Sequence, residues 1–243
     1  MQIVITMAGL GTRFKKAGYT MPKYEIKVRG RSLFSWSMES LEGFYDEKND
    51  YYFIVRSEDD ASHFIKSEWE STGRDAGKVH VIELDHMTDG QATTAMLASS
   101  EWKKDDPLLI YNIDTYVEAG QMKTADITGD GFIPCFKAPG DHWSFVELDE
   151  AGDAVSVREK ARISDNCTLG AYYFSSCGLY EQMYSEYYSD DSNMEKGEKY
   201  VAPLYNYMIK KGMKVRISLV DPKSVHVLGT PEELEIFANE GQS

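Results

Sequence analysis

Residues 2–13 read QIVITMAGLGTR, and this stretch sets the architecture of the chain: an apolar run leads directly into a glycine-rich segment. β-Branched residues dominate positions 2–6, which favours a buried strand. Gly9 and Gly11 follow, and glycine lets backbone N–H groups come close to an anion because it adopts positive φ and has no side chain. The segment is not a Walker loop, and Phe14, three residues after Gly11, does not fit the dinucleotide fingerprint. We therefore predict an anion-binding turn at the carboxyl end of the first strand.

Short apolar runs and helical patterns alternate through the first half of the chain. Strands are predicted at residues 51–55, 79–83 and 108–111, and helices at 33–44, 57–69 and 91–102. This order is typical of an α/β fold with a mostly parallel central sheet and helices on both faces. The glycine-rich turn would then lie at the carboxyl edge of the sheet, where ligands gather in open α/β folds.

The pattern changes in the second half, where one strand follows another. Strands are predicted at residues 132–136, 144–148, 154–157, 168–174 and 214–219, and a helix at 200–211. Thr230, Pro231 and Glu233 mark the start of a last helix, which is expected to end near Ala238. We therefore predict a small antiparallel subregion within one domain that spans residues 1–243, because neither a linker nor an internal repeat divides the chain.

The charge of the chain is unevenly distributed. The 26 basic and 40 acidic side chains give a net charge of −14, which argues against a nucleic-acid partner or an anionic membrane surface. Residues 13–31, however, contain seven basic side chains and one acidic one, a local balance of +6. The remainder carries −20. This distribution predicts a site for a small anion beside the glycine-rich turn.

Three cysteines occur, at positions 135, 167 and 177, without a CxxC pair. An odd number fits small buried thiols in a reducing compartment better than a disulfide framework. The first residues do not resemble a signal peptide, and no apolar stretch approaches about 18 residues. We therefore expect a cytoplasmic protein.

Polar residues at the ends of predicted strands and helices are candidates for ligand binding. Asp114 follows the strand at 108–111, where a carboxylate facing a basic glycine loop would suit Mg²⁺ carried on phosphates. The alternative for Asp114 is a turn or a helix cap. Gln91 begins a helix, and its amide could read the edge of a base or simply cap the helix. Glu159 and Lys160 close a predicted hairpin, where they either bind a polar phosphorylated substrate or form an exposed ion pair.

Several motifs together resemble a known family. They are Met7–Phe14 (MAGLGTRF), Pro22-Lys23, Gly90-Gln91-Ala92, Asp114, Val157-Arg158-Glu159-Lys160, residues 170–174 (GAYYF), residues 198–206 (EKYVAPLYN) and residues 229–234 (GTPEEL). In this order the chain resembles the sugar-phosphate nucleotidylyltransferases, also called nucleoside-diphosphate-sugar pyrophosphorylases, and most of all the subgroup with a short Met-Ala-Gly-x-Gly loop. The resemblance implies a Rossmann-like nucleotide-diphospho-sugar transferase fold. It also implies Mg²⁺-dependent transfer of a nucleotidyl group from an NTP to a phosphate, with release of pyrophosphate.

The resemblance assigns roles to most of these motifs. A nucleotide-binding half, residues 1–118, and an acceptor-binding half, residues 130–243, are implied. The residues that would bind the nucleotide are Ala8, Gly9, Leu10, Gly11, Thr12, Gly90 and Gln91. Arg13 would bind the departing pyrophosphate, Lys23 the α-phosphate and Lys160 the acceptor phosphate. Asp114 would hold Mg²⁺, and Trp143, Glu159 and Gly170 would form the acceptor pocket.

The chain departs from the family pattern at two positions that concern function. Tyr24 and Glu25 follow Pro22-Lys23 where an apolar pair is usual. Val227 stands where the family has a second metal-binding aspartate, so either Asp114 alone holds the ion, or Asp221 or His226 substitutes.

These departures leave three readings of the activity open. A sugar 1-phosphate acceptor with a pyrimidine NTP, giving an NDP-sugar for surface polysaccharide, is favoured by the family. A cytidylyltransferase acting on a non-sugar acceptor such as an amino-alcohol or amino-acid phosphate is the first alternative, since Trp143 could stack on a cation. A catalytically silent nucleotide sensor is the second, because of Val227. A glycosyltransferase would need Asp-x-Asp, but Asn112 precedes Asp114. A homo-oligomer is left open.

Overall fold

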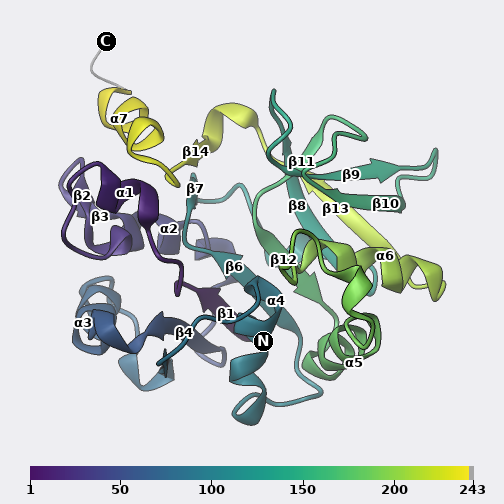
Figure 1. The fold of residues 1–243 in the computed structure, drawn as a ribbon, viewed down its shortest axis with the longest axis horizontal. Coiled ribbons are helices and arrows are strands. Elements are labelled where there is room, and N and C mark those ends of the chain that lie inside the picture. Colours follow the sequence, from purple (N-terminus) through teal and green to yellow (C-terminus); the bar gives the residue numbers. More distant parts are fainter. Residues whose placement is uncertain (241–243) are drawn as a thin grey trace.

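The structure is a computed structural model that describes residues 1–240 and consists of one large sheet with helices packed on it (Figure 1). The main strands are β1 (Gln2–Thr6), β4 (Asp50–Arg56), β5 (Val79–Leu84), β6 (Leu108–Asn112), β8 (Gly131–Lys137), β9 (Ser144–Leu148), β10 (Ala154–Glu159), β11 (Asn166–Thr168), β12 (Ala171–Phe174) and β13 (Val215–Leu219). The helices are α1 (Thr12–Lys16), α2 (Leu33–Glu39), α3 (Ser62–Ser71), α4 (Gln91–Met96), α5 (Cys177–Tyr187), α6 (Ala202–Lys210) and α7 (Pro231–Asn239). Two small sheets pair β2 (Lys27–Val28) with β3 (Arg31–Ser32), and β7 (Thr115–Val117) with β14 (Val225–Val227).

The ten-stranded sheet is parallel at its centre and antiparallel toward one side. Its order is β10-β9-β11-β8-β12-β6-β1-β4-β5, with β13 pairing beside β8. Strand β1 runs parallel to β4 and β6, and β4 runs parallel to β5. Strand β12 is antiparallel to both β6 and β8, so it joins the two parts into one sheet. This confirms the predicted α/β class, with a mostly parallel centre and an antiparallel subregion.

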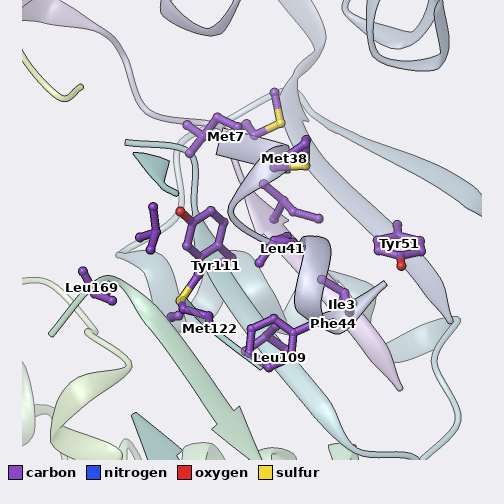
Figure 2. Close-up of a cluster of buried hydrophobic side chains, with 14 of the residues drawn as sticks. Ile3, Met7, Met38, Leu41, Phe44, Tyr51, Leu109, Tyr111, Met122 and Leu169 are labelled. Atoms are coloured by element: carbon purple, nitrogen blue, oxygen red, sulfur yellow. The ribbon is translucent and has the colours of Figure 1, made fainter. Parts of the chain in front are cut away.

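Both faces of the central strands are buried, and alternate residues pack on opposite sides. Ile3 and Ile5 belong to one hydrophobic cluster, which Figure 2 shows closely, whereas Val4 belongs to the cluster on the other face. Leu109 and Ile110 divide in the same way. Successive side chains of a strand point to opposite faces, so a continuous apolar run is the pattern that a sheet covered on both sides requires.

Each face has its own set of helices. Met38 of α2 and Trp69 of α3 pack in the first cluster, while Ala95 of α4, Tyr180 of α5 and Tyr205 of α6 pack in the second. These five side chains are all fully or almost fully buried. The helices therefore cover the sheet and leave its carboxyl edge for the loops.

A third, smaller cluster attaches the last helix to the start of the chain. Phe14, Leu228, Leu234 and Phe237 pack together, so α7 lies beside α1 at the upper left of Figure 1. The backbone N–H of Leu228 also donates to the carbonyl of Asp114 at 2.7 Å. The segment that joins β14 to α7 is thus held against the end of β6.

Several element boundaries differ from the prediction, and local packing explains the differences. The strand expected at 168–174 is divided into β11 and β12 by Gly170, whose φ is +74°. The helix expected from Ser57 begins at Ser62, because residues 57–59 form a short 3-10 turn and Asp60 is left-handed. The helices expected at 33–44, 91–102 and 200–211 are shorter, at 33–39, 91–96 and 202–210, and 3-10 turns continue the first two. Helix α5 was not predicted at all.

Within residues 1–240, none of the helices combines the length and apolarity needed to cross a membrane.

Candidate active site

A cavity of about 610 Å³ opens at the carboxyl edge of β1 and β6, between the glycine-rich turn and the β9–β10 hairpin. Most of the residues singled out from the sequence lie around it. They are Ala8, Gly9, Arg13, Lys23, Gly90, Gln91, Asp114, Trp143, Glu159, Lys160 and Gly170. The fold thus brings both halves of the chain to one site, and the roles of these residues stay predictions.

The glycine-rich turn has backbone donors that the protein leaves free. Among the residues that the structure describes, none accepts a hydrogen bond from the N–H groups of Ala8, Gly9, Leu10 or Gly11. Gly11 has φ +60°, and an added methyl group on Gly9 or Gly11 would touch nothing within 4 Å. Only glycine visits such conformations easily and leaves room above the turn. The turn can therefore present several N–H groups to an anion.

Three members of the predicted nucleotide loop do not line this cavity. Leu10 and Gly11 line a second cavity of about 280 Å³ on the other side of the turn, together with Arg56. Thr12 begins α1 and lines neither cavity. The turn therefore forms a wall between the two cavities, with Gly9 and Lys23 shared by both.

Lys23 and Asp114 form an ion pair across the cavity. The Lys23 ammonium donates to Oδ1 of Asp114, and it is only 13% exposed, whereas Asp114 is 44% exposed. Lys23 lies in a short turn after Pro22, and Asp114 follows β6. A mostly buried lysine thus faces a carboxylate that remains open to the cavity.

Gln91 is fixed by neighbours that the sequence reading did not select. Its amide Nε2 donates to Asn112 Oδ1 and lies 3.4 Å from Thr6 Oγ1. Thr6 and Asn112 end the adjacent strands β1 and β6, and both line the cavity. Because the donor of Gln91 is used inside the protein, only its carbonyl oxygen remains for a base. The position of Asn112 two residues before Asp114 was the available signal for it.

Gly90 is held tightly against the segment before α6. Its φ is +138°, and a methyl group there would lie 2.4 Å from the carbonyl oxygen of Lys199. The Lys199 ammonium pairs with Asp89 at 2.7 Å, and this hydrogen bond raises the pKa of Lys199. Burial alone would raise the pKa of Asp89, but the hydrogen bonds from Lys199 and Thr93 lower it. Gly90 is thus required by backbone packing as well as by any contact with a nucleotide.

Glu159 and Lys160 lie at the end of β10 and face the cavity in different ways. The Glu159 carboxylate is 9% exposed and accepts from the Ser144 hydroxyl, and its Oε1 lies 3.7 Å from the ammonium of Lys160, whose side chain is 43% exposed. The ion pair considered above is therefore present, with its acidic partner buried. Lys160 has a left-handed backbone, with φ +51°, and its N–H donates to the Trp143 carbonyl at 2.9 Å. Its ammonium donates to the Tyr200 hydroxyl at 2.9 Å, and this bond raises the pKa of Lys160.

Gly170 contributes to the cavity by allowing Asn112 to pack. A methyl group on Gly170 would lie 2.8 Å from Asn112 Nδ2, and the Gly170 carbonyl accepts from the Asn112 N–H at 3.0 Å. The residue therefore sets the spacing between β6 and the β11–β12 corner.

The two substitutes considered for the missing aspartate do not face the cavity. The carboxylate of Asp221 accepts from the Lys223 N–H and caps a 3-10 turn. The ring of His226 stacks on that of Tyr116, with the ring centroids 5.3 Å apart, and its Nδ1 lies 2.7 Å from Glu240 Oε2. Val227 itself lines the cavity with hydrocarbon. The hypothesis that Asp221 or His226 replaces the aspartate is therefore wrong for this arrangement.

Glu233 is the acidic residue that the sequence reading missed. It lines the cavity from the first turn of α7, and its Oε2 is buried with no hydrogen-bond partner within residues 1–240. Glu233 was read only as part of a helix-start signal, and nothing local in the sequence directs it toward Asp114.

Tyr24, the unusual residue after Pro22-Lys23, is part of the core. It is 2% exposed and donates to Asp59 at 3.1 Å, beside the second cavity. Burial raises its pKa above the ordinary value, so the phenol stays protonated. Tyr24 does not line the larger cavity and gives no support for an unusual acceptor.

Solved structures with the same fold define the class of the protein. A nucleoside-diphosphate-sugar pyrophosphorylase from Vibrio cholerae RC9 matches with a TM-score of 0.89 and 33% identity, over 98% of this chain and 100% of that one. An inositol-1-phosphate CTP transferase from T. maritima matches with a TM-score of 0.76 and 15% identity, over 99% of this chain and 96% of that one. A protein assigned as a glucose-1-phosphate thymidylyltransferase from Bacillus anthracis matches with a TM-score of 0.78 and 14% identity, over 98% and 94%. No family model and no protein of curated function matches the chain.

The matches at 14% and 15% identity show the fold alone, which is the Rossmann-like fold of nucleotidyltransferases. The Vibrio protein shares a third of its residues over nearly the whole length. The chain therefore belongs to the nucleoside-diphosphate-sugar pyrophosphorylase family, the sugar-phosphate nucleotidylyltransferases, as the motifs predicted.

Proposed function

We propose that the protein transfers an NMP group from an NTP, with a pyrimidine base favoured, to a phosphorylated small molecule, and that a sugar 1-phosphate is the acceptor. The family membership supports the reaction type. One observation carries the proposal: Ala8 and Gly9, whose N–H groups have no acceptor among the described residues, line one cavity together with Lys23 and Lys160. Three separate anion-binding groups suit two phosphorylated substrates that repel each other.

In this reaction, an oxygen of the acceptor phosphate forms a bond to the α-phosphorus of the NTP. The bond from the α-phosphorus to the bridging oxygen breaks, and pyrophosphate leaves with the electron pair. The attacking oxygen is already ionised, so positioning and charge neutralisation supply the catalysis and no general base is needed.

Each basic group of the cavity has a part in that neutralisation. The amides of the turn and Arg13 hold the β- and γ-phosphates, which become pyrophosphate. Lys23 leaves Asp114 and neutralises charge at the α-phosphate, where a compact ammonium suits a small developing charge. Lys160 binds the acceptor phosphate, and its bond to Tyr200 keeps it charged and oriented.

The oxygen atoms beside Gly229 fit Mg²⁺. The cavity contains the half-exposed carboxylate of Asp114 and the buried Oε2 of Glu233, which has no hydrogen-bond partner among residues 1–240. Carboxylate oxygens are the ligands that Mg²⁺ takes in proteins. Asp114 is the residue that would hold the ion. The bound ion would supply further neutralisation of the phosphate charge.

A non-sugar acceptor is the second candidate. His142 and Trp143, whose ring centroids lie 4.3 Å apart, line the same cavity as the acidic residues Glu159 and Glu198. Aromatic rings and carboxylates suit a positively charged amino alcohol. A structural neighbour of the same fold is named as a CTP transferase for inositol 1-phosphate.

The test is a matrix of four NTPs against pooled sugar 1-phosphates and amino-alcohol phosphates, with pyrophosphate release as the measurement. We expect release that depends on both an NTP and an acceptor. The acceptor pool that supports it decides between the two candidates. Nucleotide binding without pyrophosphate release in every combination would contradict the proposal and favour a nucleotide sensor.

A further inference from the structure

Val227 stands where the resemblance to the family implies a second metal-binding acid, and it lies close to Asp114. Val227 pairs with Thr115 in the β14–β7 sheet, directly after Asp114. Its hydrocarbon side chain lines the cavity and cannot bind a cation. Asp221 and His226 are engaged elsewhere, as described above.

Glu233 lies on the same side of the cavity, and the backbone fixes its position. The Thr230 hydroxyl accepts from the Glu233 N–H at 3.1 Å, which anchors the first turn of α7. A methyl group built on Gly229 would lie 3.4 Å from Glu233 Oε2 and 3.9 Å from Asp114 Oδ2. The two carboxylates therefore flank one point beside Gly229, where a hydrated cation could contact both.

Helix capping does not explain the orientation of the Glu233 side chain. In a capping box, the glutamate at this position reaches back to the N–H of the capping residue. Here Oε2 is buried and accepts no hydrogen bond from any described residue. A buried carboxylate oxygen without a partner costs free energy, and a bound cation would remove that cost.

We propose that Glu233 completes a divalent-cation site with Asp114 and takes the place of the acid that Val227 lacks. The second carboxylate of this site comes from the first turn of α7 and not from strand β14. The part that this site plays in phosphate transfer rests on the proposed function, but binding of the metal does not.

The experiment measures Mn²⁺ binding to the nucleotide-free protein by electron paramagnetic resonance of the free ion. We expect Glu233→Gln to weaken binding at least about tenfold, because mutation of even an outer-shell partner of a metal typically costs about 10- to 100-fold in affinity. Glu232→Gln is the matched control, because Glu232 is exposed in the same helical turn and does not line the cavity. Adding Val227→Asp to Glu233→Gln should restore binding, since residue 227 also faces the cavity.

Each outcome separates this site from the proposed reaction. Wild-type affinity in Glu233→Gln, or equal losses in Glu232→Gln and Glu233→Gln, would overturn the role of Glu233. Even if the role of Glu233 is overturned, the proposed function stands as long as the wild-type protein releases pyrophosphate from an NTP. A Mn²⁺ site that depends on Glu233 in a protein that never releases pyrophosphate would overturn only the reaction.

Discussion

Two of the basic residues that face the cavity are held by protein partners before any ligand binds. Lys23 pairs with Asp114, and Lys160 donates to Tyr200. A phosphate that binds either lysine therefore competes with, or adds to, a contact already present. Such contacts fix the rotamers of long side chains, which lowers the entropy cost of binding.

Lys23→Ala tests the role of the α-phosphate contact. We expect turnover to fall at least about 100-fold, the scale of losing one preorganised charge contact, while the thermal midpoint changes little. Lys27→Ala is the control, because Lys27 is exposed and lies away from both cavities. Near wild-type pyrophosphate release in Lys23→Ala would show that Lys23 does not stabilise the transferred group.

Lys160→Met tests acceptor binding. We expect kcat/KM for the acceptor phosphate to fall about 10- to 100-fold, because a hydrogen bond to a charged group contributes roughly 1.5–3 kcal/mol. Lys196→Met is a matched control, since Lys196 is also left-handed, with φ +52°, but is exposed and outside the cavity. Equal effects of the two substitutions would assign the loss to the strained backbone and contradict a role in acceptor binding.

The elements meet at positions where only glycine fits, and Gly90 is the clearest example. Between β5 and α4, Gly90 touches the backbone of Lys199, which precedes α6. The N–H of Ala92 donates to the Lys199 carbonyl at 3.0 Å, and the Lys199 N–H donates to the Asp89 carbonyl at 2.7 Å. Hydrogen bonds therefore join the two segments on both sides of Gly90. This junction aligns Gln91 with the ends of β1 and β6.

Gly90→Ala should therefore destabilise the fold. The strained φ alone costs about 1–3 kcal/mol, and the close contact with Lys199 adds to it. A lowered midpoint in urea unfolding, followed by circular dichroism, measures the loss. Gly9→Ala is the contrasting variant, because its φ is not positive and nothing lies within 4 Å of the added methyl group. We expect Gly9→Ala to keep the midpoint but weaken NTP binding; a normal midpoint in Gly90→Ala would contradict the packing argument.

At the scale of the whole molecule, the two buried faces of the sheet protect every cysteine. Cys135, Cys167 and Cys177 are fully buried and free. Burial raises the pKa of Cys177 to about 12 and that of Cys135 well above its usual range. Because the reactive form is the thiolate, the native protein should not react with a thiol reagent at pH 8.

Colorimetric thiol titration measures this directly. We expect no reacting thiol in the native protein and three in denaturant, since only unfolding of the sheet exposes them. Rapid labelling of even one cysteine under native conditions would show that one of the two faces opens locally.

Local signals in the sequence were sufficient for the class of fold and for most of the residues that line the candidate site. The apolar run of β1 and the glycines that follow it depend on neighbouring residues only, so periodicity and composition reveal them. Helix α5 was not predicted because its buried face consists of Cys177, Tyr180 and Met183 among polar and tyrosine residues. Its sequence therefore gives a weak apolar pattern, and packing on the sheet stabilises the helix.

The sequence by itself determined a doubly covered sheet, a glycine-rich turn at its carboxyl edge and an excess of positive charge beside that turn. Only the tertiary structure decided how the polar side chains pair. It directs the Gln91 donor to Asn112, buries Tyr24 against Asp59 and brings Glu233 to the side of Asp114. The reason is physical: strand and helix periodicity is a property of adjacent residues, whereas these contacts join residues far apart in the chain. Their geometry depends on how the sheet and its loops pack as a whole.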